Sequence, residues 1–240
     1  MCRVGLGRRS TPCRPIGAAG VEQPARLFAV RRRTPDILQS CGRDRHWLQL
    51  TSEILTDRLR LRAWLPTDRA PFAALNADPR VMEHFVSTLS RERSDALASQ
   101  FEATFDRYGF GFWAVDVPGM AAFVGFVGLS VPHFQTHFTP CVEIGWRLSA
   151  EYWDRGYATE GARAALRFGF DALQLREIVA LTVQGNVRSR RVMEKIGMVH
   201  NPADDFDHPL VPDGHPLRRH ILYRVSNPEL PNKRLQPSAA

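Results

Sequence analysis

The sequence predicts a mixed α/β fold, in which an antiparallel region is followed by a β-α-β unit. Two apolar stretches, 112–117 and 122–131, flank Pro118-Gly119 and predict a hairpin. Further along, segments 142–148 and 178–183 have the composition of strands, and 157–173 between them has helical periodicity. A chain with both kinds of connection is expected to form a mixed sheet flanked by helices.

The other elements follow in order along the chain. Leu59 and Leu61 alternate with arginines, which predicts a strand with one buried face. Pro66 favours a helix start, and Asp78-Pro79 ends that helix. We therefore also expect strands at 55–62 and 221–225, helices at 66–76, 90–107 and 187–196, and a helical turn at 80–85. The helix at 157–173 carries small residues that would let it sit close on the sheet, namely Ala158, Ala162, Ala165 and Gly169.

Composition limits the classes of partner. With 44% hydrophobic residues, the 240-residue chain can bury a sizeable core. No apolar run approaches the roughly 18 residues that a membrane span needs, so we expect no membrane partner. The net charge of +7 resides in residues 1–50, where ten arginines stand against three acidic residues, so the remainder is formally neutral. This distribution argues against a nucleic-acid-binding surface on the domain.

The composition also divides the chain into an Arg-rich leader at 1–50, expected to be disordered, a folded domain at 51–227 and a polar tail at 228–240. Three interpretations of the leader stay open: an upstream start outside the functional chain, a basic accessory tail, or an organellar transit peptide. The four cysteines lack zinc or redox spacing, which favours a reducing, cytoplasmic compartment. His133 and His137 lie in a Pro-bounded loop without a third ligand, so we expect no metal site.

The first motif is a strand, a turn and a helix. The strand contains Glu143-Ile144-Gly145-Trp146, and the turn contains Trp153-Asp154-Arg155-Gly156-Tyr157-Ala158. The first N–H groups of a helix have no internal partner, and the helix dipole adds about half a positive charge there. Gly156 and Ala158 would leave this helix start open to a phosphate. A purely structural turn is the competing interpretation.

The second motif follows the next strand. Asn186 can cap a helix that contains Ser189, and the run Glu194-Lys195-Ile196-Gly197-Met198 ends it. Together the two motifs strongly resemble the GNAT N-acetyltransferases, whose pattern is E-I-G-[WY], Q/R-x-x-G-x-G/A and N-x-x-S-x-x-x-x-E-K-x-G-[FM]. The segment 55–62 is also similar to the first strand of the branch that includes the ribosomal-protein N-terminal acetyltransferases. The resemblance covers about 170 residues and leaves only the two tails.

The resemblance implies a GNAT fold, with a mostly antiparallel sheet and a splayed parallel strand pair that binds acetyl-CoA as the acetyl donor. It implies cosubstrate contacts from Ile144, Trp146, Trp153, Asp154, Arg155, Gly156, Tyr157, Ala158, Thr159, Asn186 and Ser189. It also makes a homodimer conceivable, because dimers are frequent in the family. Two positions depart from the pattern: Trp153 replaces a frequent Gln or Arg, and Met193 replaces a frequent tyrosine acid.

Two catalytic residues follow from the resemblance. Glu143 is the candidate base that takes a proton from the amine, and Ser189 is the candidate to protonate or hydrogen-bond the departing thiolate. Strand alternation puts Cys141, Glu143, Gly145 and Arg147 on one face, opposite Val142, Ile144, Trp146 and Leu148. The competing interpretations are a solvated carboxylate for Glu143 and a first-turn serine without chemical role for Ser189.

The acceptor stays open between a protein N-terminus and a small molecule. An α-amino group, with a pKa of about 7.7–8.0, needs less help from a base than a lysine does. We expect the segments 78–85 and 204–217 to wall the acceptor site, and the acidic residues of the latter could attract a cationic amine. Two alternative functions remain: a catalytically silent CoA-binding module, and an Arg-rich RNA-binding protein whose binding is lost with the leader and reduced by salt.

Overall fold

The computed structural model describes residues 53–229. The predicted disordered leader at 1–50 and all but the first two residues of the predicted tail lie outside the described residues. Within the described part, no helix is both long enough and apolar enough to cross a membrane.

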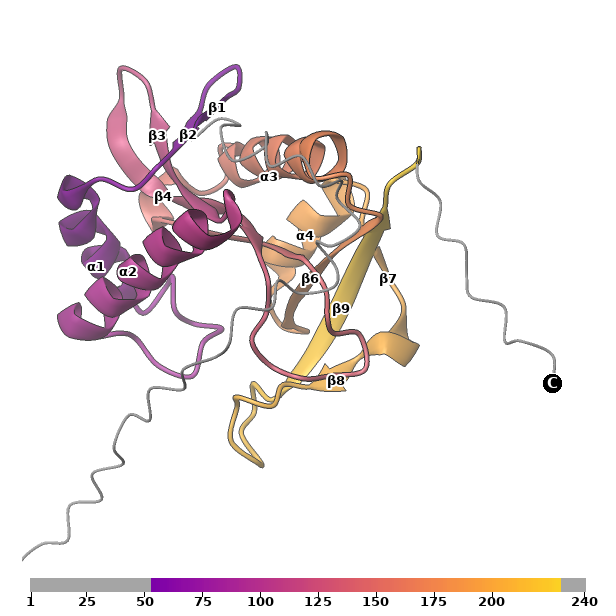
Figure 1. Cartoon of the computed structure of the whole chain (residues 1–240). Coiled ribbons are helices and arrows are strands. Elements are labelled where there is room, and N and C mark those ends of the chain that lie inside the picture. The colour runs from indigo at the N-terminus through magenta and orange to yellow at the C-terminus, as the bar shows by residue number, and fades with distance from the viewer. Residues whose placement is uncertain (1–52, 230–240) are drawn as a thin grey trace, which may run out of the picture. The chain divides into compact units, whose positions relative to one another are not determined.

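The described residues form a nine-stranded sheet in the order β1-β2-β3-β4-β5-β6-β9-β7, with β8 also paired to β9 (Figure 1). Among these strands only β5 and β6 run parallel, and every other described pair is antiparallel. The strands are β1 Glu53–Leu55, β2 Arg60–Arg62, β3 Phe112–Val117, β4 Ala121–Ser130, β5 Glu143–Leu148, β6 Glu177–Val183, β7 Val199–His200, β8 Phe206–Asp207 and β9 Arg219–Ser226. This mixed, mostly antiparallel sheet confirms the predicted fold class.

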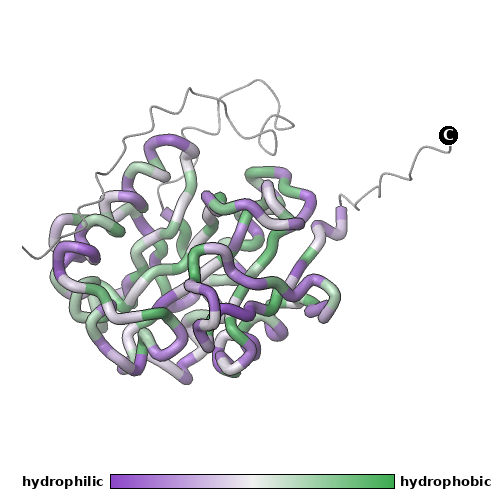
Figure 2. Tube along the Cα trace, turned by 90° about the horizontal axis from the view of Figure 1, so that it is seen from below, coloured by the Kyte–Doolittle hydropathy of each residue, from purple (hydrophilic) through white to green (hydrophobic). Residues whose placement is uncertain are grey.

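Helices cover the sheet in two groups, which Figure 1 separates. They are α1 Arg69–Ala77, α2 Arg91–Tyr108, α3 Tyr157–Arg167 and α4 Val187–Lys195. Helix α3 packs on the main core beneath β4, β5 and β6, whereas α1 and α2 enclose an aromatic cluster around Phe72 and Phe126. Figure 2 shows the hydrophobic segments gathered in the interior and the hydrophilic ones mainly along peripheral turns.

The small residues of α3 act as predicted. Ala162 and Ala165 are fully buried against the sheet. A Cβ at Gly169, in the π-helical turn Phe168–Ala172 that continues α3, would lie 2.6 Å from the Ile178 Cδ1 atom of β6. A side chain at this position would therefore displace the end of Ile178 from its place against the helix.

Three local predictions were wrong. The segment 55–62 is not one strand, because the Thr56 hydroxyl accepts from the Leu59 N–H and closes a turn between β1 and β2. Residues 80–85 form turns without a helix. The two-residue strands β7 and β8 were not predicted, because they are too short to show a periodic pattern and exist only through pairing with β9.

The feature that positions the site is the junction of β5 and β6. Their ladder contains a single pair, Glu143 with Val179, fastened by the Val179 N–H donating to the Val142 carbonyl at 3.0 Å. Beyond this point β5 pairs only with β4 and β6 only with β9, among the described strands. The carboxyl-terminal halves of the two parallel strands are therefore unpaired on their facing edges.

A buried ionic cluster ties β2 to β3 and to the start of α1. The Arg62 guanidinium donates to Asp68 at 2.7 and 2.9 Å and to Asp116 at 3.0 Å, and both carboxylates are 2% exposed. In Arg62→Met, Asp68 stays buried without its cation and Asp116 keeps only the exposed Arg60, so we expect the free energy of unfolding in urea to fall by about 3–5 kcal/mol.

A matched control uses the other arginine on the same carboxylate. Arg60 contacts Asp116 at 2.6 Å, but its side chain is 46% exposed. Water replaces an exposed partner, so Arg60→Met should destabilise the protein far less. Equal losses for the two variants would contradict a role for burial.

Candidate active site

The turn before α3 has backbone geometry suited to an anion. Gly156 caps the helix with φ +82°, and Asp154 also has a positive φ of +59°. In the described part of the chain, the backbone N–H groups of residues 154–159 donate no hydrogen bond. Unpaired donors at a helix start, together with the helix dipole, favour a bound phosphate.

Trp153 fits this turn despite its departure from the family pattern. Its indole N–H donates to the Leu148 carbonyl at 2.8 Å, which fastens the turn to the end of β5. The ring packs partly buried against both cores. The tryptophan therefore shapes the turn by packing and by one hydrogen bond to β5.

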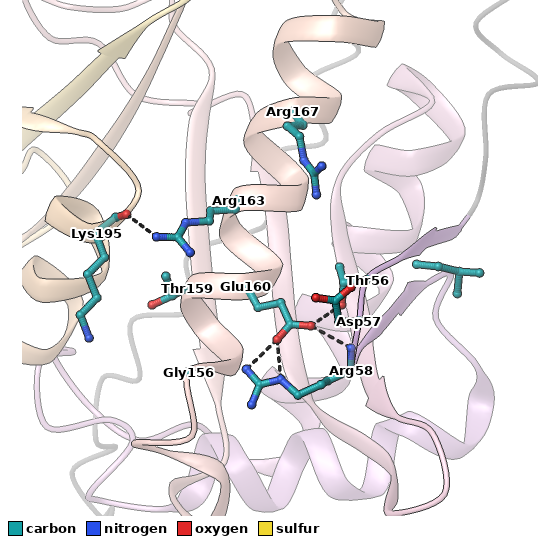
Figure 3. Close-up of a pocket in the computed structure, with 10 residues that line it drawn as sticks. Thr56, Asp57, Arg58, Gly156, Thr159, Glu160, Arg163, Arg167 and Lys195 are labelled. Atoms are coloured by element: carbon teal, nitrogen blue, oxygen red, sulfur yellow. Dashed lines mark hydrogen bonds and ion pairs between the residues drawn. The ribbon is translucent and has the colours of Figure 1, made fainter.

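A groove of about 700 Å³ runs along the outer face of α3 from Gly156 (Figure 3). The lining includes four cationic side chains, those of Arg58, Arg163, Arg167 and Lys195. Arg58 comes from the β1–β2 turn, donates to the Arg155 carbonyl at 3.0 Å and pairs with Glu160 at 2.6 Å. The sequence patterns did not select Arg58, because only the tertiary fold brings it to the start of α3.

We call the space between the unpaired facing edges of β5 and β6 the β5–β6 gap. The second motif follows β6 on one side of this gap, and the first motif follows β5 on the other. Asn186 caps α4 by accepting from the Ser189 N–H at 3.2 Å, and its amide donates to the Thr182 hydroxyl at 3.0 Å. Both ends of its amide are thus engaged within the protein. In the first turn of α4, Arg188 pairs with Asp154 at 2.7 Å and lies 4.9 Å from the Trp153 ring centroid. This ion pair joins the two helix starts.

Several predicted contact residues can offer only their backbone. Ile144 is 1% and Tyr157 5% exposed, and both side chains belong to the main core. Trp146 and Ala158 are half-buried beside the same core, whereas Thr159 lines the groove. The Arg155 guanidinium lies over the Tyr152 ring at 5.8 Å, on the surface.

Glu143 is a carboxyl group in a strongly desolvated position at the start of β5. Its carboxyl group forms no hydrogen bond or ion pair with any residue between 53 and 229, and desolvation raises its pKa to about 7. A carboxyl group that titrates near neutral pH suits a general base. On the same strand face, burial raises the pKa of the Cys141 thiol to about 12, which removes it as a nucleophile.

The raised pKa of Glu143 predicts a pH-dependent stability. The folded state holds a proton between the ordinary pKa of 4.5 and about 7, so the wild-type protein loses stability as the pH rises through this window. Glu143→Gln has no such titration. We expect the Tm of the variant minus that of the wild type to increase from pH 5 to pH 8 in thermal denaturation. A difference that is constant with pH would contradict the desolvation of Glu143.

The position of Met193 excludes a side-chain acid there. Met193 is 2% exposed in the main core, at the place where the family frequently has tyrosine. Ser189 is half-buried in the first turn of α4, beside the β5–β6 gap.

Comparisons with known proteins place these features in a family. Residues 58–199 match the model of the acetyltransferase (GNAT) domain. The Bacillus subtilis protein YkkB, which is named as uncharacterized, is 34% identical over 148 residues, covering 61% of this chain and 85% of that protein.

Two solved structures share the fold. The acetyltransferase (GNAT family) from Bacillus anthracis aligns with a TM-score of 0.61 and 26% identity, over 73% of this chain and 98% of its own. RimJ from Mycobacterium smegmatis, in complex with CoA-disulfide, aligns with a TM-score of 0.56 and 21% identity, over 72% of this chain and 84% of its own.

Proposed function

Because the chain belongs to the GNAT acetyltransferase family, we propose that it transfers an acetyl group directly from acetyl-CoA to the primary amine of a protein N-terminus or a small molecule. The observation that carries this proposal is the run of unpaired backbone N–H groups at residues 154–159, in front of a helix dipole. This turn opens beside the unpaired edges of β5 and β6, and Glu143 lies where the two strands meet.

The residues present fit acetyl-CoA as a substrate. The pyrophosphate would bind the N–H groups of the turn, where Gly156 has no side chain to obstruct it. Arg188 has only an exposed ion pair with Asp154 to exchange for a phosphate. The unpaired backbone edge of β5 offers hydrogen-bonding groups to the amides of the pantetheine arm. The complex of RimJ with CoA-disulfide supports this assignment by likeness of fold.

The reaction requires the protein to position the two substrates and to supply one proton acceptor. A neutral amine attacks the thioester carbonyl, the N–C bond forms, and the C–S bond breaks as the thiolate leaves. Glu143 takes the proton that the amine loses, directly or through water. The hydroxyl of Ser189 hydrogen-bonds the thiolate, since the buried thioether of Met193 has no proton to give.

Three carboxylates of the acidic segment expected at the acceptor site already contact basic side chains of the protein itself. Asp204 pairs with Arg224 at 2.8 Å, and Asp205 with His200 at 2.7 Å. Asp207 lies 3.3 Å from the Arg219 guanidinium. Because these carboxylates already have partners within the protein, we do not assign a polycationic acceptor to this segment.

A catalytically silent CoA-binding module is the second candidate. The observation that favours it is Met193, because the family's frequent acid is absent at this position. The two candidates share the binding turn and differ only in turnover.

Two measurements on the full chain test the proposal. Isothermal titration with acetyl-CoA should give one site per chain, and release of the CoA thiol should follow addition of an accepted amine from a broad panel. Binding without release for any amine would support the silent module. Failure of the folded protein to bind acetyl-CoA would reject both candidates.

We also propose a cytoplasmic location. The support is Cys141, which is a buried free thiol in the described residues, as a reducing compartment would keep it.

A further inference from the structure

Arg147 on β5 is a desolvated cation without a carboxylate partner. Its Nη1 donates to the Asn76 Oδ1 atom at 2.5 Å, and its Nε is buried without any partner. No ion pair within residues 53–229 involves this guanidinium, and desolvation lowers the pKa of Arg147 to about 10. The residue as a whole is half-buried, but its Nε atom is fully enclosed and has no partner. Enclosed charged groups in proteins are normally paired, so an unpaired one at a candidate site points to a ligand.

The surroundings hold the guanidinium in one orientation. Its Cζ lies 4.1 Å from the Phe85 ring centroid and 5.5 Å from that of Phe126, so aromatic faces flank its plane. Asn76, which fixes Nη1, is fully buried and in turn donates to the Ser94 hydroxyl at 2.8 Å. The side chain is thus preorganised, and the edge formed by Nε and Nη2 carries no hydrogen bond to a described residue.

This edge has the chemistry of a carboxylate site. The Nε–H and Nη2–H donors of an arginine form a planar fork that matches the two oxygens of a carboxylate. Phe85, which covers the guanidinium, is 42% exposed and belongs to the segment predicted to wall the acceptor site. The cation therefore lies between the strand and a wall that solvent reaches.

Arg147 and Glu143 share one face of β5. They are four positions apart along the strand, which is about 13 Å between their Cα atoms. Both side chains are long and both project from the face opposite α3, where α1 and the segment after it lie. An acceptor whose amine reaches Glu143 would hence present its other end to Arg147.

We propose that Arg147 binds a carboxylate of the acceptor, so that the acceptor is a primary amine that also carries a carboxylate group. This inference rests on the proposed acetyl transfer, and it names the class of acceptor for that site. A free amino acid and a peptide with an acidic side chain near its N-terminus share this chemistry. The fork would bind the carboxylate oxygens in either case.

The test compares each carboxylate acceptor with its neutral carboxamide in the full chain. The panel contains α-, β- and γ-amino acids, peptides with an acidic second residue and a blocked C-terminus, and amines without any carboxylate. We expect the wild type to favour carboxylates over carboxamides in kcat/KM by about 10- to 100-fold, the range for charge-assisted hydrogen bonds. Arg147→Met should remove this preference mainly through KM, and Arg147→Lys should restore part of it.

Two controls separate recognition from folding. The ratio of kcat/KM for a carboxylate acceptor to that for its carboxamide is compared between variants. Differences in amine pKa between the acid and its amide are the same in every variant and therefore cancel. Arg91→Met removes an exposed arginine of α2 that pairs with Asp95 outside the segments expected to wall the acceptor site, and it should leave the preference unchanged. Titration of acetyl-CoA into Arg147→Met should give the wild-type affinity, which shows that the variant is folded.

The outcomes distinguish this inference from the proposed function. Transfer by the wild type to amines regardless of a carboxylate, or a preference that persists in Arg147→Met, would overturn the carboxylate site and leave acetyl transfer standing. Transfer to no amine in the panel would overturn both. Among carboxylate acceptors, a preference for amino acids over acidic peptides, or the reverse, identifies the source of the carboxylate.

Discussion

Gly156→Glu is expected to lower the affinity for acetyl-CoA by at least about 100-fold in isothermal titration of the full chain. The backbone at this residue has φ +82°, where a side chain costs about 1–2 kcal/mol. A Cβ would lie 3.3 Å from the Arg58 Nη2 atom. The added carboxylate would occupy the anion position at the start of α3 and repel a pyrophosphate there.

Gly119 offers a matched control for the backbone strain. It has φ +76° in the β3–β4 turn, and a Cβ there would meet no atom within 4 Å. Gly119→Glu carries the same strain and charge beside Met120, whose sulfur contacts the Tyr157 hydroxyl at 3.9 Å. It therefore tests whether the loss of affinity requires a side chain at residue 156 itself, and it should bind acetyl-CoA like the wild type. Wild-type affinity in a folded Gly156→Glu protein would locate the pyrophosphate somewhere other than this turn.

Glu143→Gln is expected to lower kcat by about 100- to 1000-fold, with little change in the affinity for acetyl-CoA. The base works only when deprotonated, and its pKa is raised to about 7. Wild-type kcat should therefore fall about tenfold for each pH unit below 7, and the variant should lose this limb of the profile. Initial rates between pH 5.5 and 9 measure both effects.

The control for this prediction is a carboxylate far from the β5–β6 junction. Glu102 on α2 pairs with Arg69 at 2.7 Å. Glu102→Gln should keep both the rate and the shape of the wild-type profile. A Glu143→Gln enzyme that retains the acidic limb would assign that limb to another group, such as the amine itself.

The long periodic elements could be predicted from the sequence because local pattern alone decides them. Helix α2 begins after the Ser90 cap and ends at Gly109, which adopts φ +73°, as its sequence indicates. The elements that the sequence patterns did not predict depend on tertiary pairing instead. Strands β7 and β8 have two residues each, and only β9 makes them strands.

The candidate site was likewise predictable only in the features that local sequence determines. The two motifs located the turn at Gly156 and the cap at Asn186, and strand alternation placed Glu143 and Arg147 on one face. Whether a charge finds a partner is a property of the folded chain, and the sequence could not show it. Arg224 and Arg219 neutralise the acidic segment from β9, whereas no carboxylate reaches Arg147 in the described structure.

The single rung between β5 and β6 has a consequence for the lifetime of the protein. Exposed strand edges are templates for pairing with other chains, and this sheet has two of them facing each other at its centre. On the proposed function, bound acetyl-CoA occupies these edges in place of the hydrogen bonds that β5 and β6 do not make to each other. Saturation at about 100 times Kd would add about 2.7 kcal/mol to the folded state. The concentration of acetyl-CoA would then affect the rate at which this protein is lost to aggregation and proteolysis. This effect is separate from its effect on the rate of catalysis.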